Sequence, residues 1–217
     1  MNSCAAVLGA SGLTGGELLP LLCRQFSRVV AIGRRPTGGS FANLSEQLTD
    51  FSGDWSVDLG GVDALFIAFG TTRKQAGSAE AFRKIDLDIP LRLAGQAVAA
   101  GVQTLVLVSA VGANPDSAIH YSRVKGKLEE GVVALGFART VILRPSLLLG
   151  NHRDRPMETL SQIILKPLAR FMLPSFRPIA AADLATAMVG ATALPEGVHV
   201  LEGKALWRLV KARGGGA

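Results

Sequence analysis

Short, mostly apolar runs alternate along the chain with longer segments in which apolar residues recur at helical spacing. The short runs are Cys4–Gly9, Arg28–Gly33, Val62–Phe69, Thr104–Val108 and Thr140–Leu143. A strand that is buried on both faces has this continuous pattern, because neither face is free to carry polar residues. We therefore expect these runs to be neighbouring strands inside the fold.

The segments between the runs predict helices at Leu13–Phe26, Ser78–Ala100 and Ser117–Leu135, with a break near Pro90 in the second. Alternation of strand and helix indicates an α/β fold with a doubly wound parallel sheet. Beyond Gly150 the pattern changes, because prolines interrupt short helical pieces. A helix at Ala180–Leu194, a strand at Val198–Leu201 and a helix near Lys204–Lys211 are expected there.

We interpret the 217 residues as a single domain in three parts. Residues 1–150 form the cofactor-binding core, residues 151–213 a small C-terminal lobe, and residues 214–217 a tail. The lobe is expected to lie over the carboxyl edge of the sheet, where ligands of open α/β sheets bind. It would complete the pocket for a small-molecule substrate.

The net charge of +6, from 23 basic and 17 acidic residues, suits an anionic ligand such as a phosphorylated cofactor. Nucleic-acid binding is not expected, because the basic residues are scattered in ones and twos. Cys4 and Cys23 cannot form a disulfide framework, and the three histidines are scattered, so no metal site is expected. Protein partners and the choice between monomer and homodimer stay open.

The segment from Lys204 to Lys211 alternates apolar and basic residues, which fits a terminal helix packed on the core better than a membrane-surface or partner helix. No apolar run approaches the length of about 18–20 residues that a membrane span needs, and no signal peptide fits the N-terminus. A cytoplasmic protein without stable membrane insertion is therefore the expectation.

The strongest motif follows the first expected strand. It is a glycine-rich loop that leads into the first expected helix and consists of Gly9, Ala10, Ser11, Gly12, Leu13, Thr14 and Gly15. Glycines allow a tight turn and let the backbone approach a pyrophosphate, which then rests on the helix N-terminus. The position and composition of this loop predict a dinucleotide site.

The end of the second strand indicates which dinucleotide is bound. An acidic residue there would bond the ribose 2′-hydroxyl of NAD, whereas arginine accommodates the 2′-phosphate of NADP. This chain has Arg34 and Arg35 after Gly33, and no acidic residue in that segment. The prediction is NADP(H). A third apolar stretch ends at Asp50 and Phe51, which makes Val62–Phe69 the fourth strand. Phe69, Gly70, Thr71 and Thr72 at the end of this fourth strand offer a close backbone approach and hydroxyl groups to the cofactor.

Tyr121 and Lys125 are four residues apart and therefore share one face of a helix. A nearby ammonium lowers the pKa of a phenol, which suits a general acid or base that exchanges a proton with a carbonyl oxygen. Ser109 follows the Thr104–Val108 strand and is expected to converge on the same site. These three residues are the predicted catalytic set, and they would also contact the cofactor.

The motifs together resemble the atypical branch of the short-chain dehydrogenase/reductase superfamily that includes the HIV Tat-interacting protein and its bacterial relatives. The resemblance rests on segments that occur in order along the chain: Gly9–Gly15, Ile32–Arg35, Gly70–Thr72, Val108–Ala113, Tyr121–Lys125 with Gly126 and Glu129, Leu143–Gly150 and Arg177–Ile179. It implies a Rossmann-like fold. It also implies that Asp50 and Phe51 lie beside the adenine, and that Arg144, Pro145 and Leu147 lie beside the nicotinamide.

One position departs from that pattern, because many relatives have two serines where this chain has Ser109 and Ala110. The leading hypothesis is an NADPH-dependent oxidoreductase in which Tyr121 protonates the oxygen of a carbonyl-like acceptor. The alternative is a non-catalytic NADP(H)-binding redox sensor or protein-interaction module. A nucleotide-sugar epimerase or dehydratase shares the motifs but normally needs a larger C-terminal domain.

Overall fold

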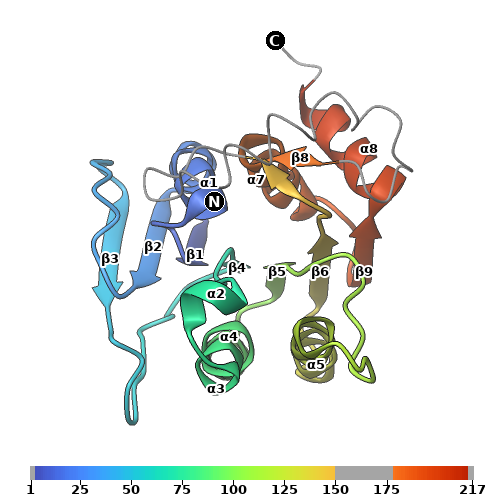
Figure 1. The fold of residues 1–217 in the computed structure, drawn as a ribbon. Helices are drawn as coiled ribbons and strands as arrows, with labels where there is room; N and C mark the ends of the chain where they lie inside the picture. Colours follow the sequence, from blue (N-terminus) through green and yellow to red (C-terminus); the bar gives the residue numbers. More distant parts are fainter. Residues whose placement is uncertain (1–2, 150–177, 215–217) are drawn as a thin grey trace.

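A computed structural model describes residues 3–149 and 178–214, which form a parallel sheet between two layers of helices (Figure 1). The strands of the main sheet occur in the order β3-β2-β1-β4-β5-β6-β9, and every pairing is parallel. Their bounds are Cys4–Leu8 (β1), Arg28–Gly33 (β2), Leu44–Leu48 (β3), Ala64–Ile67 (β4), Thr104–Val108 (β5), Arg139–Arg144 (β6) and Gly197–Glu202 (β9). The predicted doubly wound α/β fold is confirmed.

Helices cover both faces of this sheet. In Figure 1, α1 (Leu13–Gln25), α7 (Ala181–Ala191) and α8 (Gly203–Gly214) lie above it. The lower layer contains α2 (Arg73–Ala76), α3 (Ala79–Arg83), the π-helical turn η1 (Lys84–Asp88), α4 (Ile89–Ala99) and α5 (His120–Ala134). A separate pair of short parallel strands joins β7 (Leu148–Leu149) to β8 (Ile179–Ala180).

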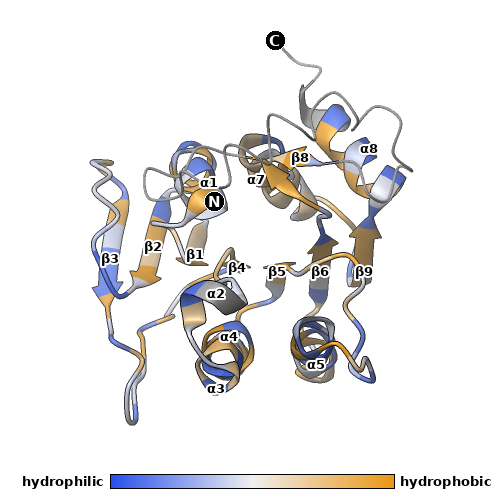
Figure 2. Cartoon of the chain, in the orientation of Figure 1, coloured by the Kyte–Doolittle hydropathy of each residue, from blue (hydrophilic) through white to orange (hydrophobic). Residues whose placement is uncertain are grey.

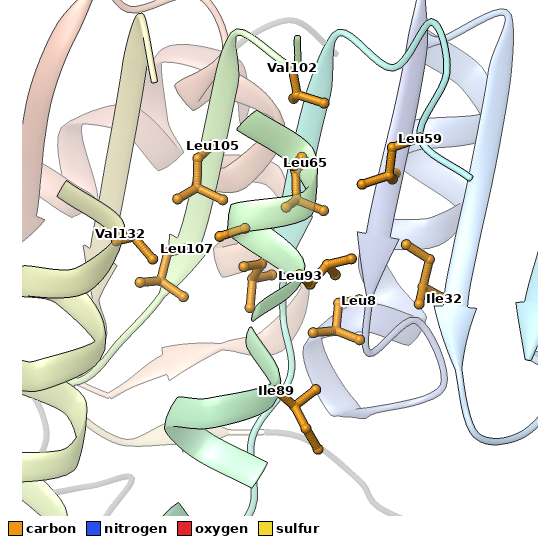
Figure 3. Packing of buried hydrophobic residues seen from close by; sticks show 14 of the residues in the cluster. Leu8, Ile32, Leu59, Leu65, Ile89, Leu93, Val102, Leu105, Leu107 and Val132 are labelled. Carbon is orange, nitrogen blue, oxygen red and sulfur yellow. The ribbon is translucent and has the colours of Figure 1, made fainter. Parts of the chain in front are cut away.

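The inner strands are continuously apolar because helices cover both faces of the sheet. Successive side chains of a strand point to opposite faces, so each one packs against one of the two helix layers. In β1, Ala6 and Leu8 belong to the cluster on the α4 side, whereas Ala5 and Val7 belong to the cluster on the α1 side. Figure 3 shows the first cluster, in which Leu8 and its neighbours on the sheet pack against α4.

The structure refines the expected elements. The third stretch, expected to be apolar and to end at Asp50 and Phe51, is the strand β3, which ends at Leu48 and contains the polar residues Ser45, Glu46 and Gln47, as suits the edge of the sheet (Figure 2). The helix expected over residues 78–100 is divided into α3, η1 and α4. Pro90 stands in the first turn of α4, where a missing backbone N–H costs no hydrogen bond.

The C-terminal part contributes to the main sheet, because β9 pairs with β6. Leu206 and Val210 of α8 are buried in the cluster that also contains α7, as expected of a terminal helix packed on the core. Residues 150–177 and the tail residues 215–217 lie outside the described residues. The substrate lobe, and Gly150 and Arg177 of the family motifs, therefore stay predictions. No helix in the described ranges is long and apolar enough to cross a membrane.

Candidate functional site

The loop between β1 and α1 has a backbone that requires glycine at two positions. Gly9 has a φ of +92°, and a Cβ atom there would lie 2.7 Å from the carbonyl oxygen of Ala68. A Cβ atom on Gly15 would lie 2.0 Å from the carbonyl oxygen of Gly9, far inside van der Waals contact. The N–H of Gly12 donates to the same Gly9 oxygen over 2.9 Å. Glycine thus lets the turn and the first helical turn pack with no side chain between them.

The N-terminus of α1 is suited to an anion. Gly12 precedes the helix without a side chain to cap it, and the first turn contains no acidic residue. The free N–H groups and the dipole of such a helix end favour a phosphate. Gly12, Leu13 and Thr14 line the main cleft, whereas Ala10 and Ser11 line a smaller hollow.

The main cleft has a volume of about 350 Å³ and lies at the carboxyl ends of β1, β4, β5 and β6. The chain order of the strands reverses between β1 and β4, and ligands of open α/β sheets bind at such a reversal. Most of the predicted site residues line this cleft, namely Gly12, Leu13, Thr14, Phe69, Gly70, Thr71, Thr72, Ser109, Tyr121, Lys125, Pro145 and Leu147. The structure therefore brings the glycine loop and the predicted catalytic set to one cavity.

Ser109 follows β5, lines the cleft and has a buried hydroxyl group. The residue is 5% exposed, and its Oγ has no hydrogen-bond partner within the described part of the chain. Its backbone N–H donates to the carbonyl oxygen of Leu143 over 2.8 Å, which fixes the position of the residue against β6. Because buried hydroxyl groups are nearly always paired, a free one in a cleft indicates a place for a polar ligand atom.

Tyr121 and Lys125 lie one turn apart on α5 and both line the cleft. Gly126 lets this helix approach the loop after β5, since a Cβ atom there would lie 2.2 Å from the carbonyl carbon of Asn114. The Tyr121 ring packs at 5.6 Å from the Phe82 ring and leaves 38% of the residue exposed. Burial raises the pKa of the Tyr121 phenol, although the charge of Lys125 acts in the opposite direction.

Sequence reasoning missed the partner of Lys125. Asp86, in the π-helical turn η1, is fully buried and its Oδ1 lies 2.7 Å from Lys125 Nζ. The other carboxylate oxygen accepts a hydrogen bond from the Thr71 N–H over 2.9 Å. The sequence offers a weak signal only, an aspartate between Ile85 and Leu87 in an otherwise helical segment.

A second hollow of about 10 Å³ lies beside the glycine loop, at the end of β2. Arg35 lines it together with Thr37 and Glu46, whereas Arg34 is exposed beside it. Within residues 3–149 and 178–214, neither arginine forms an ion pair. Sequence reasoning missed Glu46, which is contributed by the polar edge strand β3.

The carboxylate of Glu46 accepts hydrogen bonds from the Thr37 N–H over 2.8 Å and from the Thr37 hydroxyl over 2.5 Å. These bonds hold the pKa of Glu46 below its ordinary value. An acidic charge therefore stands next to Arg35 at neutral pH.

Asp50 and Phe51 line neither of these cavities. The carboxylate of Asp50 accepts hydrogen bonds from the N–H and the hydroxyl of Ser52, each over 2.8 Å, as a simple turn cap does. Phe51 is 2% exposed, has a φ of +59°, and packs edge-on against Trp55 at 5.0 Å. The structure thus gives both residues local structural contacts, and the adenine contact stays a prediction.

Arg144 does not line the main cleft, although Pro145 and Leu147 next to it do. Its guanidinium donates to both carboxylate oxygens of Glu129 on α5, with Nη2 lying 2.5 Å from Oε2. This pairing raises the pKa of Arg144 above its ordinary value. Arg144 thus joins β6 to α5, and its expected contact with the nicotinamide stays a prediction.

The fold and the cleft together define a protein with a Rossmann-like α/β fold and a ligand cleft at the carboxyl ends of its parallel strands. No family model matches the chain. A search of curated proteins, however, finds Protein FMP52-1, mitochondrial, of Scheffersomyces stipitis, which is 40% identical over 196 residues and covers 86% of this chain and 87% of the relative. Protein fmp52, mitochondrial, of Emericella nidulans is 39% identical over 176 residues, or 76% of each chain. The chain belongs to the FMP52 family.

Solved structures with the same fold include MoeE5 in complex with UDP-glucuronic acid and NAD, with a TM-score of 0.71 and 20% identity over 93% of this chain and 76% of that one. The human epimerase family protein SDR39U1 with NADPH has a TM-score of 0.64 and 21% identity over 92% of this chain and 73% of that one. At this identity the likeness establishes the fold alone. The closer resemblance to the branch of the HIV Tat-interacting protein stays a prediction.

The comparisons correct one expectation. The relatives are named as mitochondrial proteins in fungi as different as Scheffersomyces stipitis, Debaryomyces hansenii and Emericella nidulans. The expectation of a cytoplasmic protein was therefore wrong. It rested on the lack of a membrane-spanning run and of a recognisable signal peptide, and neither observation separates the cytoplasm from the interior of an organelle.

Proposed function

We propose that this protein binds NADP(H) and reduces a carbonyl-like acceptor, with Tyr121 as the general acid. One observation carries the proposal: the buried Ser109 hydroxyl without a partner, the Tyr121 phenol and the Lys125 ammonium line the same cleft as the N-terminus of α1. That cleft lies at the strand reversal where α/β sheets bind their ligands.

The residues at the glycine loop fit a dinucleotide. A Cβ atom on Gly9 or Gly15 would collide with backbone, so glycine at both positions lets the loop turn tightly into the start of α1. The uncapped helix end would hold the pyrophosphate. Phe69, Gly70, Thr71 and Thr72 line the wall between this end and the catalytic set, where the rest of the cofactor would lie.

The exposed guanidinium groups of Arg34 and Arg35 support NADP(H) over NAD(H), since arginine pairs with a phosphate through charge-assisted hydrogen bonds. Arg35 lines the hollow beside the glycine loop and is the residue that we expect to contact the 2′-phosphate. Glu46 in the same hollow would moderate this preference, because its carboxylate repels a phosphate.

When bound, the reduced nicotinamide supplies the hydride that forms the new C–H bond. Tyr121 donates its phenolic proton to the acceptor oxygen as the carbonyl π bond breaks, and the product is an alcohol. The Ser109 hydroxyl donates a hydrogen bond that holds the same oxygen in place. The phenolate then recovers a proton from water, to which Tyr121 is 38% exposed.

The alternative, a non-catalytic NADP(H) sensor, is favoured by one observation. Asp86 pairs with Lys125, so that the ammonium does not act on Tyr121 as an isolated positive charge. A sensor would need the cofactor-binding residues but no acid, and it would bind NADPH without turnover.

The test is NADPH oxidation across a panel of quinones, aldehydes and ketones, with the wild type and Tyr121→Phe compared. Loss of a general acid lowers turnover by about 10²–10⁴-fold. The phenylalanine should leave NADPH binding in place, because the ring and its packing on Phe82 remain. Tight NADPH binding by the wild type with no turnover of any acceptor would instead support the sensor.

A further inference from the structure

Asp86 is the most deeply buried charged group near the cleft. It lies in η1, a π-helical turn between α3 and α4, and its residue exposure is 0%. Such widened turns interrupt a regular helix and occur often at functional sites. Here the turn directs a carboxylate towards α5, where Lys125 Nζ lies 2.7 Å from Asp86 Oδ1.

The ion pair is built into the wall of the cleft. Asp86 Oδ2 accepts a hydrogen bond from the Thr71 N–H, and a Cβ atom on Gly70 would lie 2.9 Å from Asp86 Oδ1 and 3.5 Å from Lys125 Nζ. The side chains of Asp86 and Lys125 are 0% and 7% exposed. A buried ion pair is often no more stable than apolar residues in its place. Stability alone is therefore a weak reason for its presence.

The pair acts on Tyr121, which precedes Lys125 by one helical turn. Burial raises the pKa of the phenol, Lys125 lowers it, and the carboxylate of Asp86 opposes Lys125. The other titratable groups nearby are His120, whose ring lies 5.9 Å from Phe82, and Glu80 of α3, which interacts with His120. β5 and the loops after β4 and β5 contribute no titratable side chain to the lining of this cleft, as far as the described residues go.

We infer that Asp86 is a positioning residue that fixes the Lys125 ammonium and cancels its charge, so that Tyr121 stays a protonated phenol and the site donates a proton instead of removing one. The reaction direction in this inference, reduction over alcohol oxidation, rests on the proposed function. The charge state of Tyr121 does not rest on it, because it is a property of the protein alone.

The chain contains a single tyrosine, so that the ultraviolet absorbance of phenolate reports Tyr121 without interference from another phenol. Wild type, Asp86→Asn and Asp88→Asn are titrated with alkali, with circular dichroism recorded in parallel to follow the fold. Tyr121→Phe serves as the blank. Asp88 belongs to the same turn but forms an exposed ion pair with Arg83 at 3.4 Å, which makes Asp88→Asn the matched control.

We expect the midpoint of the Tyr121 titration to lie at lower pH in Asp86→Asn than in the wild type. In Asp88→Asn this midpoint should stay unchanged. An asparagine keeps an oxygen for the Thr71 N–H, so the change is mainly one of charge. At a pH well below both midpoints, a variant that titrates one pH unit lower contains about ten times more phenolate than the wild type. A midpoint that is unchanged in Asp86→Asn, or lowered as far in Asp88→Asn, overturns the inference.

The double variant Asp86→Asn/Lys125→Met leaves no unpaired buried charge and guards against misfolding of the single variant. The midpoint of the Tyr121 titration in the double variant should lie close to the wild-type midpoint. A midpoint well below the wild-type one would contradict the inference that the charges of Asp86 and Lys125 cancel. Where an acceptor is turned over, Asp86→Asn should also raise alcohol oxidation relative to reduction at neutral pH. If no variant turns over any acceptor, the proposed function fails, whereas the titration still decides the charge state of Tyr121.

Discussion

The two ends of the main cleft are built in different ways. The glycine end consists of the loop Gly9–Gly15 with the start of α1, and the second hollow with Arg34 and Arg35 lies beside it. It is made of backbone and of exposed charges that are close in sequence. The tyrosine end consists of Ser109 directly after β5, Tyr121 and Lys125 on α5, and Asp86 in η1. In the proposed function the first end binds the cofactor through the shape of its backbone, and in the inference about Asp86 the second end sets the charge of the Tyr121 phenol.

The largest effect is expected at the tyrosine end, from Lys125→Met. This change leaves the buried Asp86 carboxylate without its partner, which costs about 3–5 kcal/mol of unfolding free energy. Lys127→Met is the matched control, because Lys127 is exposed on the same helix and its loss should cost less than about 0.5 kcal/mol. Urea unfolding measures both. Equal stability of the two variants would show that the Lys125 pair is not important for folding.

At the glycine end, Gly15→Ala should destabilise the fold by about 1–3 kcal/mol and weaken NADPH binding, because its Cβ has to displace the Gly9 backbone. The adjacent Gly16→Ala is the control, since a Cβ there meets nothing closer than the Ala10 carbonyl oxygen at 3.9 Å. Thermal unfolding and NADPH fluorescence titration follow the two variants. An alanine at position 15 that binds NADPH as well as the wild type would refute the role given to this loop.

The third effect separates the two arginines. Arg35→Ala should weaken NADPH binding by about 1.5–3 kcal/mol, the range for hydrogen bonds to charged groups, and leave NADH binding nearly unchanged. Arg34→Ala should have a smaller effect, because Arg34 does not line the hollow that contains Arg35. Both losses should shrink as salt is added. Equal losses of binding free energy for NADPH and NADH would contradict the assignment of these arginines to the 2′-phosphate.

The smallest effect is expected from Glu46→Gln. The hydrogen bonds from Thr37 hold the pKa of Glu46 low, so that the wild-type carboxylate stays charged well below neutral pH. Removing this charge should strengthen NADPH binding by about 0.2–1 kcal/mol at low salt, the scale of an exposed charge pair. NADPH affinities of wild type and variant, measured at low and high salt, provide the check. Weaker binding by the variant would mean that Glu46 serves the cofactor and does not repel it.

The glycine end could be predicted from the sequence because its parts are local. The loop follows a strand and starts a helix, and Arg34 and Arg35 come directly after β2. Helical spacing likewise placed Tyr121 and Lys125 on one face of α5. The sheet was predictable for the same reason, since its inner strands are short continuous apolar runs.

The parts that could not be predicted depend on contacts between distant residues. Asp86 and Lys125 are 39 positions apart in the sequence, and they form an ion pair because the π-helical turn η1 directs Asp86 towards α5. Glu46 belongs to the polar edge strand β3. Arg144 forms an ion pair with Glu129 and does not line the cleft. The presence of a residue in a sequence motif does not show which distant residue it contacts in the folded protein.

The most direct test of the account is calorimetric titration of the wild-type protein with NADPH and, separately, with NADH. We predict saturable binding of one nucleotide per chain, with NADPH bound more tightly than NADH. Absence of binding for both nucleotides would contradict the assignment of the cleft, and tighter binding of NADH would contradict the role of the arginines beside it.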